Sequence, residues 1–380
     1  MKKLVLIGGG HAHVEVLRQF GRQRAPEAEI TLVSPDRHTP YSGMLPGLVA
    51  GHYTFEQCHI DLQPLAAYAG ARLIFAEARA LDAAQRTISL NNGDTLTYDL
   101  LSINTGSTPI VNGIAGAMEH AIMVKPVAAF LKQWAALIER VRKGEAHRIT
   151  VVGGGAAGVE MLLAMQHFFA HQTPRREVDY SLITDAPHVL AQHPRGVRTL
   201  LEGNLMRKQV RVHSGLRVTR VAADTLIARD AQNREQPITT DAIVWITGAA
   251  PPTWLADNGL ALDGKKFINE NNYLQSTSRG EIFAAGDCAT VAGAVYPKSG
   301  VYAVRQGPVL AHNLRAALNG QSGEALQTYT PQPRALALIS TGEQHAIASW
   351  GPLALHGNWV WRWKDSIDRG FMGKYRDFPA

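Results

Sequence analysis

A strand, a glycine turn and a helix at the N-terminus constrain the fold more than any other stretch of the chain. Residues 4–7 form a continuous apolar run, which is typical of a strand buried on both faces of a parallel sheet. Three glycines follow at 8–10, and a helix with an apolar side begins directly after them. Such a turn presents backbone N–H groups and the positive end of a helix to a pyrophosphate. The pattern therefore predicts a dinucleotide site.

This fingerprint is incomplete. Gly8 and Gly10 fill the first two positions of G-x-G-x-x-G, but His13 takes the third, where glycine normally allows the helix to pack closely on the strand. Taken alone, the match is equally compatible with an ordinary tight turn. Further evidence has to come from the rest of the chain.

Composition narrows the class of protein. A chain of 380 residues that is 46% hydrophobic can bury a large core and is long enough for two domains or slightly more. A net charge of +6 suits anionic partners such as phosphate cofactors or acidic lipids. The charge is spread thinly, which argues against nucleic-acid binding. No signal peptide and no apolar run of the roughly 18 residues that a spanning helix needs is present. We expect a cytoplasmic protein, or one peripheral to the inner face of the cell membrane.

The segment after the first unit departs from the usual pattern. A second strand at 29–33 ends at Ser34, where an acid usually holds the ribose hydroxyls, and Asp36 and Arg37 follow it. Residues 38–47 are too rich in Pro and Gly for regular structure and too apolar for a solvent loop. They are either a buried turn or a segment that lies along a bound ring system.

A second copy of the unit follows. Short strands are predicted at 71–76, 87–90 and 95–97, then a buried strand that breaks on Thr105-Gly106, and a helix at 127–143. Residues 148–152 read as another buried strand, and Gly153, Gly155 and Gly158 complete a G-x-G-x-x-G that opens a helix before a strand at 178–183. Two units at the right spacing predict a protein that binds two dinucleotides.

The segment 280–289 (Gly-Glu-Ile-Phe-Ala-Ala-Gly-Asp-Cys-Ala) carries a family resemblance. It resembles the second FAD fingerprint of the pyridine nucleotide–disulfide oxidoreductase superfamily, whose aspartate, here Asp287, binds the flavin ribityl chain. Residues 34–46, 297–300 and 305–307 and the C-terminal tail are similar to type II NADH dehydrogenases and sulfide:quinone oxidoreductases. The resemblance is strongest to the branch that includes demethylphylloquinone reductase and the flavoprotein half of selenide, water dikinase fusions.

The resemblance implies FAD and NAD(P)H as cofactors, with hydride passing to the flavin and two electrons passing on to a quinone or another small-molecule acceptor. Disulfide reductases carry a cysteine pair near residues 41–46, and this chain has only Cys58 and Cys288, far apart. We interpret both as packed residues rather than nucleophiles. Two alternatives stay open: a flavoenzyme that acts on a sulfur or selenium compound, and a non-catalytic FAD-binding redox partner or sensor.

Two residues are candidates for catalysis. Glu160 stands where related enzymes place a glutamate near the nicotinamide, although an acid in the first turn of a helix also favours the helix dipole. Lys298 is expected to stabilise a reduced flavin or a quinone oxygen by its charge, the alternative being a solvated loop lysine. Thr184 stands at the usual place of the ribose-binding acid and Asp185 follows it, which favours NADH and leaves NADPH open. No metal site is predicted. The predicted cofactor-binding residues are Gly8, Gly9, Gly10, His11, Ala12, Ser34, Pro35, Arg37, Ser42, Gly43, Ala78, Thr105, Gly106, Gly286, Asp287, Lys298, Ser299, Gly153, Gly155, Ala156, Gly158, Glu160, Thr184 and Gly248.

The tail from 331 onward has a different character. Residues 336–340 and 346–350 predict a hairpin around Gly342. Residues 358–371 predict a helix with an aromatic and apolar stripe among basic residues, which suits packing on its own protein or contact with a membrane surface or a second subunit. We favour interface contact, with a homodimer as one form of it. The stripe consists of Trp359, Trp363, Ile367 and Phe371, interleaved with Arg362, Lys364 and Arg369.

The expected fold is therefore α/β, with two Rossmann-like dinucleotide-binding domains and a small C-terminal module. We expect an FAD domain in two parts, 1–115 and 256–330, around an NAD(P)H domain at 116–255, followed by an interface module at 331–380.

Overall fold

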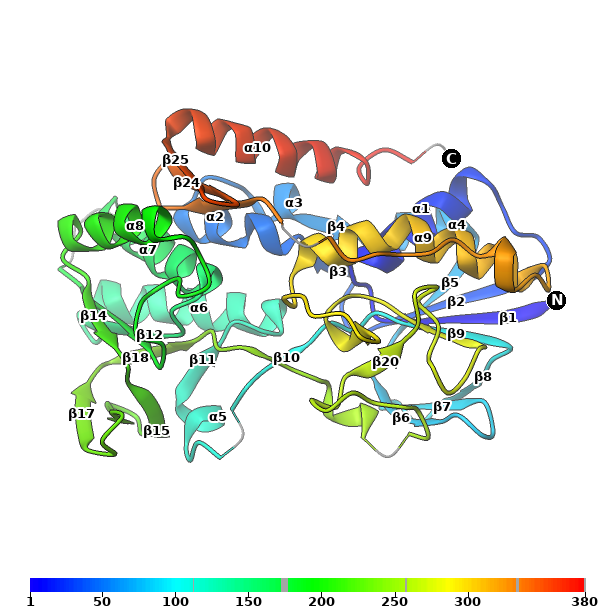
Figure 1. Ribbon diagram of the computed structural model, residues 1–380, viewed down its shortest axis with the longest axis horizontal. Coiled ribbons are helices and arrows are strands. Elements are labelled where there is room, and N and C mark those ends of the chain that lie inside the picture. The colour runs from blue at the N-terminus through cyan, green and yellow to red at the C-terminus, as the bar shows by residue number, and fades with distance from the viewer. Residues whose placement is uncertain (112, 172–176, 257, 333–334, 379–380) are drawn as a thin grey trace.

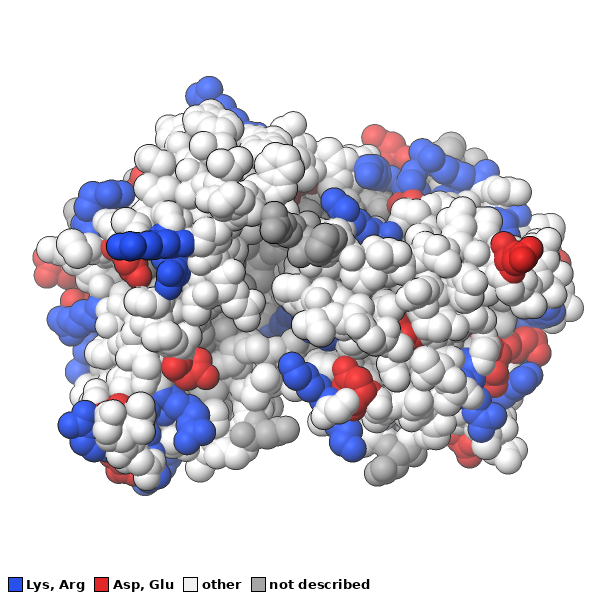
Figure 2. All heavy atoms as spheres, viewed as in Figure 1, with Lys and Arg blue, Asp and Glu red and all other residues white. Residues whose placement is uncertain are grey.

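The structure is a computed structural model that describes residues 1–111, 113–171, 177–256, 258–332 and 335–378. It has two lobes, each built on a five-stranded parallel sheet, and a smaller C-terminal module that lies across both (Figure 1). Figure 2 shows that the surface is hollowed between the lobes and that the walls visible on this face carry few charged side chains.

The sheet of the first lobe combines strands from both ends of the chain. Its order is β21-β9-β1-β2-β5, and neighbouring strands run parallel. Because β21 follows the second lobe in sequence, the first lobe is completed only when the chain returns to it. The strands are β1 (Lys2–Ile7), β2 (Ala28–Ser34), β5 (Ala71–Phe75), β9 (Leu100–Ile103) and β21 (Ile282–Ala284).

Side chains of β1 alternate between two cores, one on each face of this sheet. Leu4 and Leu6 pack in the cluster covered by α1, α4 and α9, whereas Val5 and Ile7 pack in the cluster under the antiparallel strands β6 to β8. This two-sided burial explains the unbroken apolar run, and each such side chain contributes roughly 1.5–3 kcal/mol. The covering elements are α1 (His11–Arg22), α4 (Leu62–Ala69), α9 (Gly300–Leu318), β6 (Ala78–Asp82), β7 (Thr87–Leu90) and β8 (Thr95–Thr97).

His13 occupies the position of the missing third glycine and is fully buried. Its Nδ1 lies 2.6 Å from the Gly8 carbonyl oxygen and its Nε2 lies 2.8 Å from Oγ of Ser102 on β9. Burial lowers the pKa of His13 to about 4, so the ring is neutral at physiological pH. Hydrogen bonds from a neutral imidazole thus replace the close contact that glycine permits at this position in other dinucleotide units.

The second lobe repeats the architecture of the first. Its parallel sheet has the order β11-β18-β12-β13-β14. The strands are β11 (Ala121–Met123), β12 (Arg148–Val152), β13 (Asp179–Thr184), β14 (Arg211–Ser214) and β18 (Ala242–Trp245). Around it lie α6 (Val127–Lys143), α7 (Ala156–Ala170), α8 (Arg195–Arg207) and the antiparallel strands β15 (Arg217–Val221), β16 (Thr225–Arg229) and β17 (Glu235–Thr239). The α/β class with two Rossmann-like units is confirmed.

The expectation that residues 38–47 lack regular structure is wrong. The chain forms β3 (His38–Pro40), a 3-10 turn η1 (Ser42–Met44) and α2 (Leu45–Ala50). Pro46 is accepted because it stands in the first turn of α2, where its missing N–H has no intrahelical partner, and Gly51 ends the helix with a φ of 85°. The chain continues through α3 (Phe55–Cys58) into β4 (His59–Asp61), which pairs antiparallel with β3.

The C-terminal module is a three-stranded antiparallel sheet followed by one helix. The predicted hairpin is confirmed as β23 (Ala337–Ser340) and β24 (Ala346–Trp350), and β25 (Leu353–Gly357) adds a third strand that the sequence analysis missed. The helix α10 (Asn358–Gly373) runs from this sheet along the top of the molecule towards the first lobe (Figure 1). The sheet contacts α7 and α8 of the second lobe, and α10 contacts α3 of the first.

Short elements connect these bodies. Two strands cross between the lobes as an antiparallel pair, β10 (Thr108–Pro109) and β19 (Ala249–Ala250). The others are α5 (Ala117–His120), η2 (Thr253–Leu255), β20 (Ile268–Glu270), η3 (Gly286–Cys288), β22 (Ala289–Val291) and η4 (Gly323–Ala325). In the described part of the chain, no helix has both the length and the apolar character needed to cross a membrane.

Candidate active site

The carboxyl ends of β1, β9 and β21 meet at one edge of the first sheet, and Asn104 fastens them together. Its Oδ1 accepts hydrogen bonds from the backbone N–H groups of Ala12 (3.1 Å) and His13 (3.3 Å), and its Nδ2 donates to the Ala285 carbonyl (2.6 Å). A Cβ added to Gly10 would lie 2.3 Å from Asn104 Oδ1. The sequence analysis did not single out Asn104, although it directly precedes the predicted Thr105-Gly106 turn.

Two buried polar atoms at this edge have no hydrogen-bond partner among the described residues. They are Nε2 of His11 and Oγ1 of Thr105, both predicted as cofactor-binding residues. The His11 ring lies edge-on to Tyr41 and to Phe371, with centroid separations of 5.4 and 6.0 Å. Burial lowers the pKa of His11 to about 4. Unpartnered buried polar atoms are costly, so these two suit a site that a polar cofactor completes.

Asp287 lies at the same edge, in η3 after β21. Its Oδ2 accepts hydrogen bonds from Ser107 Oγ (3.2 Å) and from Lys125 Nζ (3.1 Å), and Lys125 also donates to Ser107 Oγ (2.9 Å). Gly286 adopts a φ of 74°, which favours glycine and brings the backbone close to Asn104. The glycine turn, the free polar atoms and the carboxylate together fit FAD. The roles of Gly8–Gly10 at its pyrophosphate and of Asp287 at its ribityl hydroxyls stay predictions.

The other residues predicted for the FAD site differ in their burial and in the contacts they already make within the protein. Ser34 is buried at the end of β2 and donates to the Asp36 carbonyl (2.9 Å). Arg37 is exposed and forms an ion pair with Asp61 (2.7 Å), so its charge is already matched within the protein. Ala78 begins β6 and is buried in the core under the sheet. Pro35, Ser42, Gly43, Gly106 and Ser299 lie in turns and at element ends.

Lys298 makes its polar contacts away from the glycine turn. Its Nζ donates to the Ala289 carbonyl and to Thr290 Oγ1 (2.7 Å) on β22, and it lies 4.2 Å from the centroid of the Phe267 ring. Desolvation lowers its pKa, partly offset by negative neighbours such as Glu270. Its hydrogen bonds go to β22 and not to Gly8–Gly10, although Asp287 also acts on it electrostatically. Its proposed role at the flavin stays a prediction.

The second glycine turn is built more tightly than the first. A Cβ on Gly158 would lie 1.9 Å from the Gly153 carbonyl oxygen, and one on Gly153 would lie 1.9 Å from that of Ile246. Gly155 caps α7 and Ala156 begins it, so the positive end of the helix opens onto the turn. Thr184 ends β13 with its side chain buried, Asp185 is exposed, and Gly248 follows β18. This arrangement suits the pyrophosphate of a nicotinamide nucleotide.

Glu160 joins the second lobe to the C-terminal module. Its Oε1 accepts a hydrogen bond from the Ser340 backbone N–H (2.8 Å). Burial raises the pKa of Glu160 to about 7, against the opposing effect of Lys364. A carboxyl group with this pKa can both hold and release a proton near neutral pH.

A polar cluster that sequence reasoning missed lies next to Glu160, under α10. Lys364 Nζ donates to Asp368 Oδ2 and to the Gly43 carbonyl, each at 2.6 Å. Burial and the neighbouring Asp368 carboxylate raise the pKa of Tyr41, and the Tyr41 ring stacks on Phe371 at 4.4 Å. Lys364 and Phe371 therefore point inward, contrary to the expectation that both face an interface. The spacing of four residues was visible in sequence, but the direction of each side chain was not.

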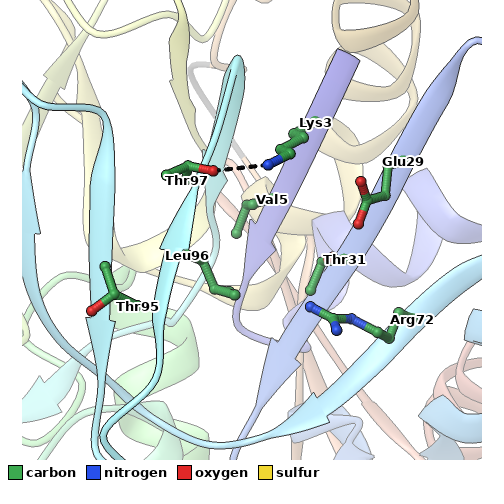
Figure 3. Close-up of a pocket in the computed structure, with 8 residues that line it drawn as sticks. All are labelled: Lys3, Val5, Glu29, Thr31, Arg72, Thr95, Leu96 and Thr97. Atoms are coloured by element: carbon green, nitrogen blue, oxygen red, sulfur yellow. Dashed lines mark hydrogen bonds between the residues drawn. The ribbon is translucent and has the colours of Figure 1, made fainter. Parts of the chain in front are cut away.

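Two surface hollows lie elsewhere. One of about 140 Å³ opens at the amino ends of β1 and β2, at the opposite end of the strands from the glycine turn (Figure 3). It is lined by Lys3, Val5, Glu29, Thr31, Arg72, Thr95, Leu96 and Thr97. The other, of about 380 Å³, lies beside α8 and is lined by Val189, Glu202, Leu205, Met206, Val210, Val212 and Ser214. The residues described around these hollows include none of the predicted cofactor contacts. No group of three or more metal-ligating side chains is found among the described residues.

Two glycine-turn units, a carboxylate at the flavin edge and two lobes in one chain define a two-dinucleotide oxidoreductase. The chain belongs to the pyridine nucleotide-disulphide oxidoreductase family, whose model matches residues 2–307. Members of this family bind FAD and NAD(P)H, and the predicted cofactors are confirmed at that level.

Several curated proteins are similar to the chain over most of its length. It is 23% identical over 341 residues to the NADH dehydrogenase-like protein YutJ of Bacillus subtilis, covering 87% of each. It is 25% identical over 353 residues to demethylphylloquinone reductase NdbB of Synechocystis, covering 90% of this chain and 85% of that protein. It is 21% identical over 403 residues to sulfide-quinone reductase of Aquifex aeolicus, covering 99% and 91%. The predicted family resemblance is confirmed.

Solved structures agree on the fold. The sulfide:quinone oxidoreductase of Aquifex aeolicus superposes with a TM-score of 0.80 at 20% identity, covering 99% of this chain and 92% of that one. NDH2 of Plasmodium falciparum in complex with NADH superposes with a TM-score of 0.83 at 15% identity, covering the whole of both chains. These likenesses show the fold. The family match and the curated relatives, which include a quinone reductase, support an NAD(P)H-dependent flavin oxidoreductase.

Proposed function

We propose that the protein passes hydride from NAD(P)H to FAD and then two electrons to a quinone-type acceptor, without a redox-active cysteine pair. The state of the cysteines supports a mechanism without a redox-active cysteine pair. Cys58 and Cys288 are the only two in the chain, both are buried and free, and they belong to different cores. Burial raises the pKa of Cys288 to about 11 and that of Cys58 to about 12. Neither is a thiolate at neutral pH.

FAD, when bound, supplies the chemistry of accepting a hydride and releasing two electrons. The protein supplies two separate approaches to it. We assign Gly153, Gly155 and Gly158 to the nicotinamide nucleotide, because a glycine turn at a helix N-terminus can receive a pyrophosphate. The close packing of this turn requires glycine, since a Cβ on Gly158 would collide with the backbone. We divide the chain accordingly into an FAD domain at 1–115 and 256–330, an NAD(P)H domain at 116–255 and a C-terminal module at 331–380.

We assign the acceptor side to the polar cluster under α10. Reduction of a quinone consumes two protons as well as two electrons, so an acceptor site needs a group that delivers protons. Glu160 meets this need through its pKa of about 7. Lys364 and Asp368 act on it electrostatically, and Lys364 also donates to the Gly43 carbonyl. The sequence analysis placed Glu160 near the nicotinamide; we propose instead that its catalytic role lies on the acceptor side of the site.

We further propose that the C-terminal module contacts a membrane surface, from which a lipophilic quinone would enter. Six large apolar side chains of the module are exposed on β24, β25 and α10. Tryptophans at such a face suit the headgroup region of a bilayer, and Arg362 adds an exposed charge. The alternative occupant of this face is a second copy of the chain. The six residues are Trp350, Leu353, Leu355, Trp359, Trp363 and Ile367.

An anaerobic titration tests the function. The FAD-loaded protein is mixed with NADH, NADPH or sulfide while the flavin absorbance is followed, and is then reoxidised with a soluble quinone. We expect rapid bleaching with a nicotinamide nucleotide and rapid recovery with the quinone. Bleaching by sulfide alone would support the sulfur-compound alternative. Failure of every donor would support a non-catalytic FAD-binding partner.

A further inference from the structure

Lys125 belongs to the second lobe but ends in the flavin site of the first. It stands between β11 and α6, directly before Pro126, the residue that caps α6. Its Nζ lies 3.1 Å from Asp287 Oδ2 and 2.9 Å from Ser107 Oγ. Ser107 follows the strand β9 and Asp287 follows β21, so the cation crosses from one lobe to the paired strand ends of the other.

Stability alone is a weak reason for this contact. The Lys125 side chain is 45% exposed, against 14% for Asp287, and ion pairs with one exposed partner contribute about 0–1 kcal/mol. Ser107 already donates to the same carboxylate oxygen. A second donor from another lobe is therefore not needed to satisfy Asp287.

The surroundings of the ammonium group point to a ligand instead. Lys125 and Asp287 both act electrostatically on the His11 imidazole. Nε2 of His11 and Oγ1 of Thr105, from the turn just before Ser107, are among the buried polar atoms that have no partner within the described residues. The lysine thus faces the part of the site where the protein leaves polar groups free for the cofactor.

We propose that Lys125 is a residue of the flavin site: a positive charge from the nucleotide-binding lobe that contacts bound FAD beside Asp287 and stabilises its reduced, negatively charged form. A reduced flavin gains negative charge, and a nearby fixed ammonium group lowers its free energy relative to the oxidised form. Lys298, which the sequence favoured for this role, has its ammonium group bound to β22. The inference deepens the proposed function but rests only on FAD binding, not on the identity of the donor or acceptor.

The test compares the two-electron reduction potentials of FAD-loaded variants by equilibration with a reference dye. Lys125→Met removes the charge, Lys125→Arg keeps it, and Lys132→Met removes an exposed charge of α6 as the matched control. We expect the reduced form of K125M to lose about tenfold in stabilisation, which lowers the potential by about 30 mV. K125R and K132M should stay near the wild-type value.

The measurement uses neither NAD(P)H nor quinone, so a failure of the proposed function does not affect it. A lysine that only joins the lobes would change the melting temperature of K125M and leave the potential unchanged. Equal potentials in K125M and K132M would therefore overturn the proposal. If K125M cannot be purified with FAD, Lys125→Gln, which keeps a hydrogen-bond donor without the charge, carries the same comparison.

Discussion

The hydroxyl of Tyr375 donates a 2.9 Å hydrogen bond to Oε2 of Glu15, across 360 positions of sequence. Glu15 is buried in α1, the helix whose first turn faces the flavin site, and also pairs with Arg18. The end of the C-terminal module is therefore fastened to the helix that begins the chain.

Removing this hydroxyl should destabilise the protein. Tyr375→Phe leaves one oxygen of a buried carboxylate with fewer donors, so we expect the free energy of unfolding to fall by about 1–3 kcal/mol. Urea unfolding followed by fluorescence measures it. Tyr273→Phe is the control, because the Tyr273 hydroxyl makes no hydrogen bond within the described residues. An equal effect of both variants would show that the contact contributes nothing.

Asp287→Ala should release FAD. The substitution removes the carboxylate assigned to the ribityl chain and leaves Lys125 without its ionic partner. Flavin absorbance after ultrafiltration measures the loss, and we expect occupancy well below that of the wild type. A variant that kept its full complement of FAD would remove Asp287 from the site.

Gly158→Val should weaken reduction by NAD(P)H and spare FAD. The new side chain would meet the Gly153 carbonyl oxygen and displace the turn that receives the pyrophosphate. Gly264→Val is the matched control, because a Cβ there meets nothing within 4 Å. The rate of flavin bleaching and the bound FAD are measured together. Parallel loss of both would mean that the two nucleotide sites are not separate.

Glu160 should make both stability and quinone reduction depend on pH. Its folded pKa of about 7 lies above the ordinary value of 4.5, so the folded state binds the proton more tightly. The free energy of unfolding should then fall as pH rises from 4.5 to about 7, and level off above that. Flavin reoxidation by quinone should slow over the same upper range. Glu160→Gln should flatten both profiles; unchanged profiles would exclude the carboxyl group as their source.

The exposed apolar face should bind liposomes. Replacing Trp359, Trp363 and Ile367 with Ser should weaken binding to anionic vesicles and slow reoxidation by a long-tailed quinone, while bleaching by NADH is spared. These side chains are exposed, so the fold should survive. Added salt should also weaken binding, because it screens attraction to the headgroups. If the intact protein ignores liposomes, size analysis of the same variant decides whether the face joins two copies.

The sequence predicted the sheet strands and the class of fold because their signals are local. Continuous apolar runs before Gly8 and Gly153 identify buried parallel strands without knowledge of their neighbours. Residues 38–47 were misjudged because Pro and Gly usually break regular structure, whereas Pro46 lies in the one turn of a helix that tolerates it.

The site was less predictable because its key contacts join distant segments. The hydrogen bonds that define the site are made by Asn104, Lys125 and Lys364 to partners 181, 162 and 321 positions away in sequence. No local pattern distinguishes a lysine that reaches a carboxylate in another lobe from one in solvent. The Lys364 side chain likewise points inward because of where α10 packs, and the aromatic and apolar stripe of residues 358–371 does not determine that position.

The position of the C-terminal module limits how the enzyme can move. Its sheet packs on α7 and α8, while Lys364 and Tyr375 bind the other lobe at Gly43 and Glu15. The module therefore bridges the two lobes and restrains their relative positions. Hinge opening would have to break either the contacts of Ser340 with Glu160 or those of α10 with the first lobe. We therefore expect substrates to reach the flavin between lobes that keep their relative positions, rather than through closure of one lobe onto the other.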